Sequence, residues 1–157
     1  MTNTKKSSRG LGNLLEQLEK LKVAVNYGAD AVFSWMDKPM VWRSRAGNFT
    51  MDELREGIEY AHPRGVDVHV ASNMVTHEGN EQGAGEWFRE LRDMGLDAVI
   101  VSDPALIEIC ATYAPGLNIH LSTQASATNV ETFHFWKEYG LTRVVIGPVR
   151  YPWKSWQ

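Results

Sequence analysis

Polar side chains gather directly after two apolar runs of strand length near the middle of the sequence. Ser102 and Asp103 follow the first run, and Ser122, Thr123 and Gln124 follow the second. Hydroxyl, carboxylate and amide groups that converge in a pocket can orient a small ligand or exchange protons with it. These residues are therefore our first candidates for a functional site.

A serine nucleophile needs a base and an orienting acid within hydrogen-bonding reach. His120 and Ser122 share one face of their predicted strand, because side chains alternate along a strand with a period of two. Ser102, Asp103, His120 and Ser122 are thus the candidates for catalysis. Asp103 also precedes Pro104, a pair typical of the start of a helix, so a capping role and a substrate contact both stay open.

Further polar residues are expected at the ends of neighbouring strands. Arg45 and Asn48 follow one predicted strand, and Asn73 follows the next. A guanidinium group can hold a carboxylate or a phosphate through two parallel hydrogen bonds. Together with Ser122, Thr123 and Gln124, these residues are predicted to bind an acidic or peptide-like substrate at one rim of the fold.

Strand segments that begin with a glycine recur along the chain and indicate a repeating fold. The glycines are Gly28, Gly65, Gly95, Gly116 and Gly140. Their spacing leaves room for one strand, one loop and one helix per unit, as in successive βα units on a parallel sheet. A closed eight-fold barrel needs roughly 250 residues. The chain has 157 residues, so we predict an α/β fold: an incomplete TIM-like (β/α) barrel of about five parallel strands with helices.

The partial barrel is expected to occupy residues 13–148, between a disordered tail at 1–12 and an irregular tail at 149–157. Open edges of a parallel sheet present unpaired backbone groups that can pair with another chain. We therefore also predict that the chain self-associates through these edges.

Helix starts are marked by residues that can cap them. The first helix is predicted to begin at Asn13. Thr50 with Glu53, and Thr128 with Glu131, have the spacing of a capping box, in which each side chain accepts from the other residue's backbone amide.

Composition limits the kinds of partner. The net charge of −3 and the isoelectric point near 5.9 argue against a broadly basic nucleic-acid surface. No apolar run reaches the roughly 20 residues of a membrane span, so we expect no membrane partner and a cytoplasmic location.

The cysteine and the histidines carry little predicted chemistry. Cys110 is the one cysteine, and its place in a helical run favours a buried, inert thiol. His77 begins a zinc-protease-like pattern, but Glu81 stands where the second histidine belongs, so no metal site is predicted. For His69 and His120, both within strands, a hydrogen-bonded core or rim histidine is the usual case.

Several segments together carry a family resemblance. They are 18–32, 45–50, 60–66, 95–105, 119–129 (Ile-His-Leu-Ser-Thr-Gln-Ala-Ser-Ala-Thr-Asn), 135–140 and 143–145. In their order, spacing and strand-end residues, the chain resembles the N-terminal barrel part of the U32 peptidase family, the collagenase-like proteases.

The resemblance implies a hydrolase that cleaves peptide bonds, with a peptide or small acidic substrate. As the alternative, it implies a factor for hydroxylating RNA (tRNA or rRNA) that uses an iron–sulfur cluster. The cysteine ligands of such a cluster would lie beyond position 157, so the resemblance implies no cofactor within this chain. A third alternative is an inactive fragment of either kind of protein.

Some segments depart from the family pattern, and they contain Trp35, Trp42, Trp153 and Trp156. We hypothesise that these pieces are read out of frame. In-frame codons for Trp35 and Trp42 in an independent read of the gene would contradict that hypothesis.

Overall fold

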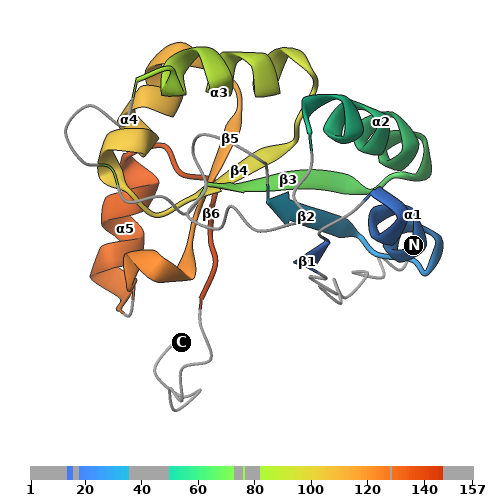
Figure 1. The fold of residues 1–157 in the computed structure, drawn as a ribbon. Helices are drawn as coiled ribbons and strands as arrows, with labels where there is room; N and C mark the ends of the chain where they lie inside the picture. Colours follow the sequence, from blue (N-terminus) through green and yellow to red (C-terminus); the bar gives the residue numbers. More distant parts are fainter. Residues whose placement is uncertain are drawn as a thin grey trace, which may run out of the picture.

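Six strands form one parallel sheet in a computed structural model that describes residues 14–15, 18–35, 50–72, 76, 82–127 and 129–146 (Figure 1). Each strand pairs with the next along the chain, in the order β1 to β6. The strands are β1 (Leu14–Leu15), β2 (Ala31–Trp35), β3 (Asp67–Ser72), β4 (Ala98–Val101), β5 (Asn118–Leu121) and β6 (Arg143–Val144). This sequential parallel order is the order of a (β/α) barrel.

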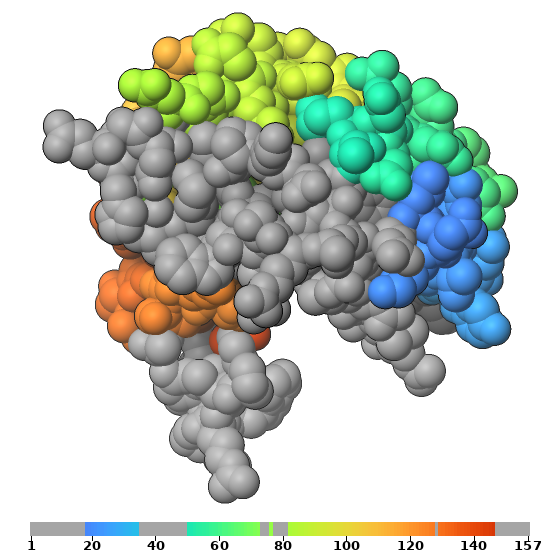
Figure 2. All heavy atoms as spheres, in the orientation of Figure 1, coloured from blue at the N-terminus to red at the C-terminus, as the bar shows by residue number. Residues whose placement is uncertain are grey.

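Helices connect the strands and follow one another around one side of the sheet (Figure 1). They are α1 (Leu18–Asn26), α2 (Met51–Ala61), α3 (Ala84–Asp93), α4 (Pro104–Tyr113) and α5 (Val130–Glu138), with short 3-10 turns η1 (His62–Arg64) and η2 (Thr123–Ala125). Figure 2 shows the blue and teal atoms of α1 and α2 lying next to each other on the outer surface. An ion pair of 2.7 Å between Lys22 and Glu56 joins these two helices.

The core lies between the helices and one face of the sheet. Val70, Val99 and Ile119 lie level with one another on neighbouring strands and belong to this core. Leu54 and Phe88 supply the helical side of the same cluster and are fully buried. Because side chains alternate along a strand, the residues between the core positions face the opposite side, called here the inner face.

The sheet is open within the described residues, because β1 and β6 each pair with only one neighbour there. This arrangement confirms the predicted fold class, an incomplete (β/α) barrel of parallel strands and helices. The prediction of self-association through the open edges is not tested by a single chain and stays a prediction. No helix in these ranges combines the length and the hydrophobicity that crossing a bilayer requires.

The prediction of a first helix from Asn13 is wrong. Leu14 and Leu15 form the short strand β1, paired in parallel with Phe33 and Ser34 of β2, and α1 begins at Leu18. Spacing alone could not separate the two states, since a leucine pair fits the apolar stripe of a helix as well as a strand. Asn13 itself, like residues 1–12 and 149–157, lies outside the described residues.

Two capping predictions have different outcomes. The capping box of Thr50 and Glu53 is confirmed, with the Thr50 amide donating to Glu53 over 2.9 Å and the Glu53 amide donating to Thr50 over 3.2 Å. At the last helix the cap is Asn129, whose side chain accepts from the Thr132 amide over 2.9 Å. The predicted cap Thr128 lies outside the described residues, and asparagine caps a helix at least as well as threonine.

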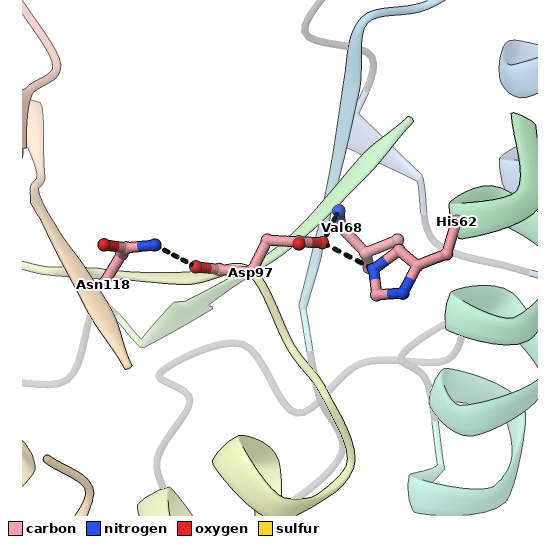
Figure 3. Close-up of polar contacts among 4 residues, drawn as sticks. All are labelled: His62, Val68, Asp97 and Asn118. Atoms are coloured by element: carbon pink, nitrogen blue, oxygen red, sulfur yellow. Dashed lines mark hydrogen bonds and ion pairs between the residues drawn. The ribbon is translucent and has the colours of Figure 1, made fainter. Parts of the chain in front are cut away.

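Asp97 joins three parts of the fold at the amino ends of the strands (Figure 3). Its Oδ2 accepts the amide proton of Val68 on β3 over 2.7 Å and lies 2.8 Å from Nε2 of His62 in η1. Its backbone carbonyl accepts from Nδ2 of Asn118 on β5 over 2.9 Å. Asp97 therefore fixes how β3, β4 and β5 are positioned relative to one another along the strand direction.

Replacing Asp97 by alanine should lower the free energy of unfolding by about 1 to 3 kcal/mol, because the partly buried amide of Val68 loses its acceptor. Urea unfolding followed by circular dichroism measures this change. His62→Ala is the matched control: it removes the contact between His62 and Asp97, whose side chains are 39% and 29% exposed, but leaves Asp97 to accept from the Val68 amide. It should cost less than about 1 kcal/mol. Equal costs for the two variants would contradict the assigned role of the amide.

Candidate functional site

The carboxyl ends of β3, β4 and β5 bring polar side chains to one edge of the sheet. Ser72 ends β3 level with Val101, the last residue of β4, and Val101 lies level with the last residue of β5. Ser102 and Ser122 each follow directly. Arg45, Asn48 and Asn73, predicted for the same rim, lie outside the described residues, so their placement stays a prediction.

Asp103 caps helix α4, which was one of the two roles that the sequence left open. Its Oδ1 accepts from the amides of Ala105 and Leu106, over 2.8 and 3.3 Å. Its Oδ2 accepts from the amide and the hydroxyl of Thr76, over 2.9 and 3.0 Å. Burial by itself would raise the pKa of Asp103, but these four hydrogen bonds outweigh it and hold the pKa below its usual range. Both oxygens are thus occupied within the protein.

Ser122 also has a structural partner, which the sequence analysis did not foresee. It caps the short turn η2, with its hydroxyl accepting from the amide of Gln124 over 3.4 Å. The side chain of Ser122 is buried, whereas Thr123 and Gln124 are exposed. The turn then closes at Ser126, whose φ of 53° is left-handed.

A nucleophile–base contact is not formed among the candidate residues that the structure describes. Ser122 directly follows β5, the strand that carries His120, but its hydroxyl is engaged with the Gln124 amide and not with the imidazole. Asp103 is engaged at the start of α4. The geometry brings these residues to one region without assembling them into a relay of serine, base and acid.

A histidine pair lies on the inner face of the sheet and was not predicted from sequence. The rings of His69 on β3 and His120 on β5 meet edge to face, with centroids 4.8 Å apart and an interplanar angle of 86°. On the intervening strand, Ala98 lies level with His69 and Ile100 lies level with His120, so the two rings meet diagonally across β4. Both histidines are buried.

The electrostatic environment keeps both imidazoles neutral near neutral pH. Burial lowers the pKa of His69, with the charges of Asp67 and Asp97 opposing the shift and that of Arg143 assisting it. Burial, His69 and Arg143 together lower the pKa of His120 to about 4. A buried neutral imidazole can donate one hydrogen bond and accept another.

Neither the cysteine nor the histidine pair provides an evident metal centre. Cys110 is buried in α4, as predicted, and burial raises its thiol pKa to about 12. Within the described ranges, no group of three or more histidine, cysteine, aspartate and glutamate side chains could hold a metal ion.

Asp103→Ala should lower the free energy of unfolding at pH 7 by about 1 kcal/mol, the usual cost of losing a helix cap. The folded-state pKa is depressed, so the stabilisation is present above the unfolded value of about 3.9 and is lost as the pH falls through the folded pKa. The difference in the free energy of unfolding between wild type and Asp103→Ala, measured by urea titration, should therefore become smaller at acid pH. Asp103→Asn keeps a capping oxygen without the charge, so its difference from wild type should be smaller than that of Asp103→Ala at pH 7 and should also narrow at acid pH. The difference between the two variants, neither of which titrates at this position, should not change over the same pH range.

Comparison with known proteins places the chain in a family. The profile of peptidase family U32 matches residues 16–148. The tRNA hydroxylation protein P1 of Bacillus subtilis (strain 168) is 45% identical over 129 residues, covering 82% of this chain and 30% of that protein. The tRNA hydroxylation protein P of Escherichia coli (strain K12) is 36% identical over 129 residues, covering 82% and 28%. The chain thus spans about a third of the length of these curated relatives.

The fold has a solved counterpart. The structure of the U32 peptidase Mk0906 superposes with a TM-score of 0.68 and 18% identity, covering 94% of this chain and 62% of that one. At such low identity the likeness shows the fold alone.

These relatives correct the main functional expectation. Peptide-bond hydrolysis, the collagenase-like label and a peptide substrate were expected from the family resemblance, but the two relatives described above are named for tRNA hydroxylation. The family assignment itself is confirmed, because the profile covers most of the sequence and the fold agrees. The chain belongs to peptidase family U32.

Proposed function

We propose that this chain forms the barrel portion of a protein that hydroxylates RNA, with tRNA as the substrate class. The observation that carries the proposal is the 45% identity over 129 residues to a protein named for tRNA hydroxylation. The family profile supports the proposal as well, because residues 16–148 contain β2 to β6 and the five helices.

The charge of the chain favours a local RNA contact over a broad one. A net charge of −3 repels the phosphate backbone at long range. Affinity for RNA must then come from a few cations and hydrogen-bond donors gathered at one place. The rim at the carboxyl ends of the strands is where parallel-sheet proteins gather such groups.

The residues of this chain do not fit an iron–sulfur cluster, which the family resemblance associates with RNA hydroxylation. Such clusters are held by several cysteine thiolates. The chain has one cysteine, Cys110, and burial raises its thiol pKa to about 12, so it stays protonated. We therefore assign no step of the reaction to a cluster held by these residues.

A chimeric protein tests the proposal. The matching 129 residues of the B. subtilis tRNA hydroxylation protein P1 are replaced by the corresponding segment of this chain. The chimera is expressed in a strain whose own genes for tRNA hydroxylation have been deleted, so that its tRNA contains no hydroxylated nucleosides. We expect the hydroxylated nucleosides to return, as measured by mass spectrometry of digested tRNA.

Two matched variants of the chimera separate folding from function. Lys22→Gln removes an exposed ion pair between α1 and α2 and should leave hydroxylation unchanged. Leu106→Asp places a carboxylate at a fully buried position and should abolish both soluble protein and hydroxylation. A chimera that accumulates in soluble form but restores no hydroxylated nucleoside would contradict the proposed function.

A further inference from the structure

We propose an oxyanion-binding site on the inner face of the sheet, formed by His120 and Arg143 with His69 beside them. Its ligand is a carboxylate or a phosphate group. The inference goes beyond the proposed function and does not depend on it, because it concerns the chemistry of one ligand group and is tested by binding.

The two imidazoles form a buried pair on the inner face of the sheet. His69 is 7% exposed and His120 is 6% exposed. Within the described part of the chain, the rings contact each other edge to face. A neutral imidazole carries one N–H donor. Each ring can therefore donate a hydrogen bond to a ligand oxygen placed beside it.

Arg143 supplies the charge of the site. It lies level with His120 in the pairing of β5 with β6. Neighbouring residues in register on parallel strands project to the same face of the sheet, so the guanidinium group lies on the inner face beside the imidazole. Its charge lowers the pKa of both histidines. Among the ion pairs of the described residues, none engages Arg143.

The donor set fits an anion better than a metal ion. Two imidazoles alone leave a divalent cation two ligands short of the usual four, and no third histidine, cysteine or acid completes such a group in the described ranges. The guanidinium group of Arg143 would repel a cation and attract a carboxylate or phosphate. The imidazole N–H and the guanidinium fork are both donors, so the ligand must supply oxygen lone pairs.

The acidic residues nearby define which end of the site the anion occupies. Asp67 and Asp97 act on His69, where they oppose the lowering of its pKa. Asp97 is already engaged with His62 and the Val68 amide. The pKa of His120, in contrast, is lowered by burial, by His69 and by Arg143, and no acidic residue of the described ranges opposes the shift. The oxyanion therefore belongs between His120 and Arg143, on the side of the pair away from Asp67.

Two sources could supply the same oxyanion chemistry. One is a phosphate of an RNA strand, and the other is the carboxylate or phosphate of a small molecule. Both would accept from the His120 N–H and the Arg143 guanidinium in the same way. The experiment below distinguishes them by competition.

The test is a titration of the 157-residue chain with inorganic phosphate, and separately with acetate, monitored by nuclear magnetic resonance of the ¹⁵N-labelled histidine rings. We expect a saturable shift of the His120 ring nitrogens. Arg143→Gln should weaken phosphate binding roughly tenfold or more, since a charge-assisted hydrogen bond is lost. Arg143 is exposed, so this change should leave thermal unfolding unaltered.

Arg92→Gln is the matched control. Like Arg143→Gln, it removes one arginine. Arg92 is partly exposed and lies on helix α3, where it pairs with Asp93 over 2.7 Å. It should bind phosphate as the wild type does. Equal affinities of the two arginine variants, or no shift of His120 with either anion in the wild type, would overturn the proposed site.

Competition with a short RNA oligonucleotide then assigns the source. If RNA displaces bound phosphate, the site is supported and its ligand is a phosphate of an RNA strand. If phosphate or acetate binds and RNA does not displace it, the site is supported and its ligand is a small-molecule anion. Hydroxylation by the chimera is measured separately. If the wild-type chain binds no anion while the chimera restores hydroxylation, this inference alone is overturned. If the wild-type chain binds the anion while a soluble chimera restores no hydroxylation, the proposed function alone is overturned.

Discussion

Backbone hydrogen bonds between β3, β4 and β5 hold Val70, Val99 and Ile119 level with one another. Because the strands are parallel and in register, this one alignment sends their side chains to the same face, where the helices cover them. The same alignment sends His69 and His120 to the opposite face. A slip of one residue in any pair would move valines inward and histidines into the apolar core. Asp97 reinforces the alignment from the amino ends, through contacts that reach β3 and β5.

Much of this arrangement could be predicted from sequence. The glycine-led units gave the repeating order of strand and helix, and Asp103 before Pro104 marked the start of α4. The histidine pair could not be predicted, because its contact depends on how β4 sets the register between β3 and β5. Pairing registers are long-range quantities that a local pattern of residues does not contain. The short strand β1 was missed for the same reason, since only its pairing with β2 distinguishes it from a helical turn.

The candidate site differs in kind from the one that the sequence suggested. Strand-end hydroxyl and carboxylate groups looked available for chemistry, but Asp103 and Ser122 are engaged as caps of α4 and η2. Caps satisfy backbone amides that would otherwise lack acceptors at a helix start. The histidine pair lies on the inner face, where neutral imidazoles are close to the charge of Arg143. Family membership and a fold shared with Mk0906 are thus compatible with ligand chemistry other than peptide hydrolysis.

Cys110 makes the core of this protein measurable. It is the one cysteine of the chain, it lies fully buried in α4, and burial raises its pKa to about 12. Alkylating reagents attack the thiolate and need access to it. The native state therefore protects the sulfur in two ways: it excludes the reagent, and it keeps the thiol protonated. The rate of thiol labelling consequently reports how often α4 leaves the sheet, so the chain carries its own probe of local opening.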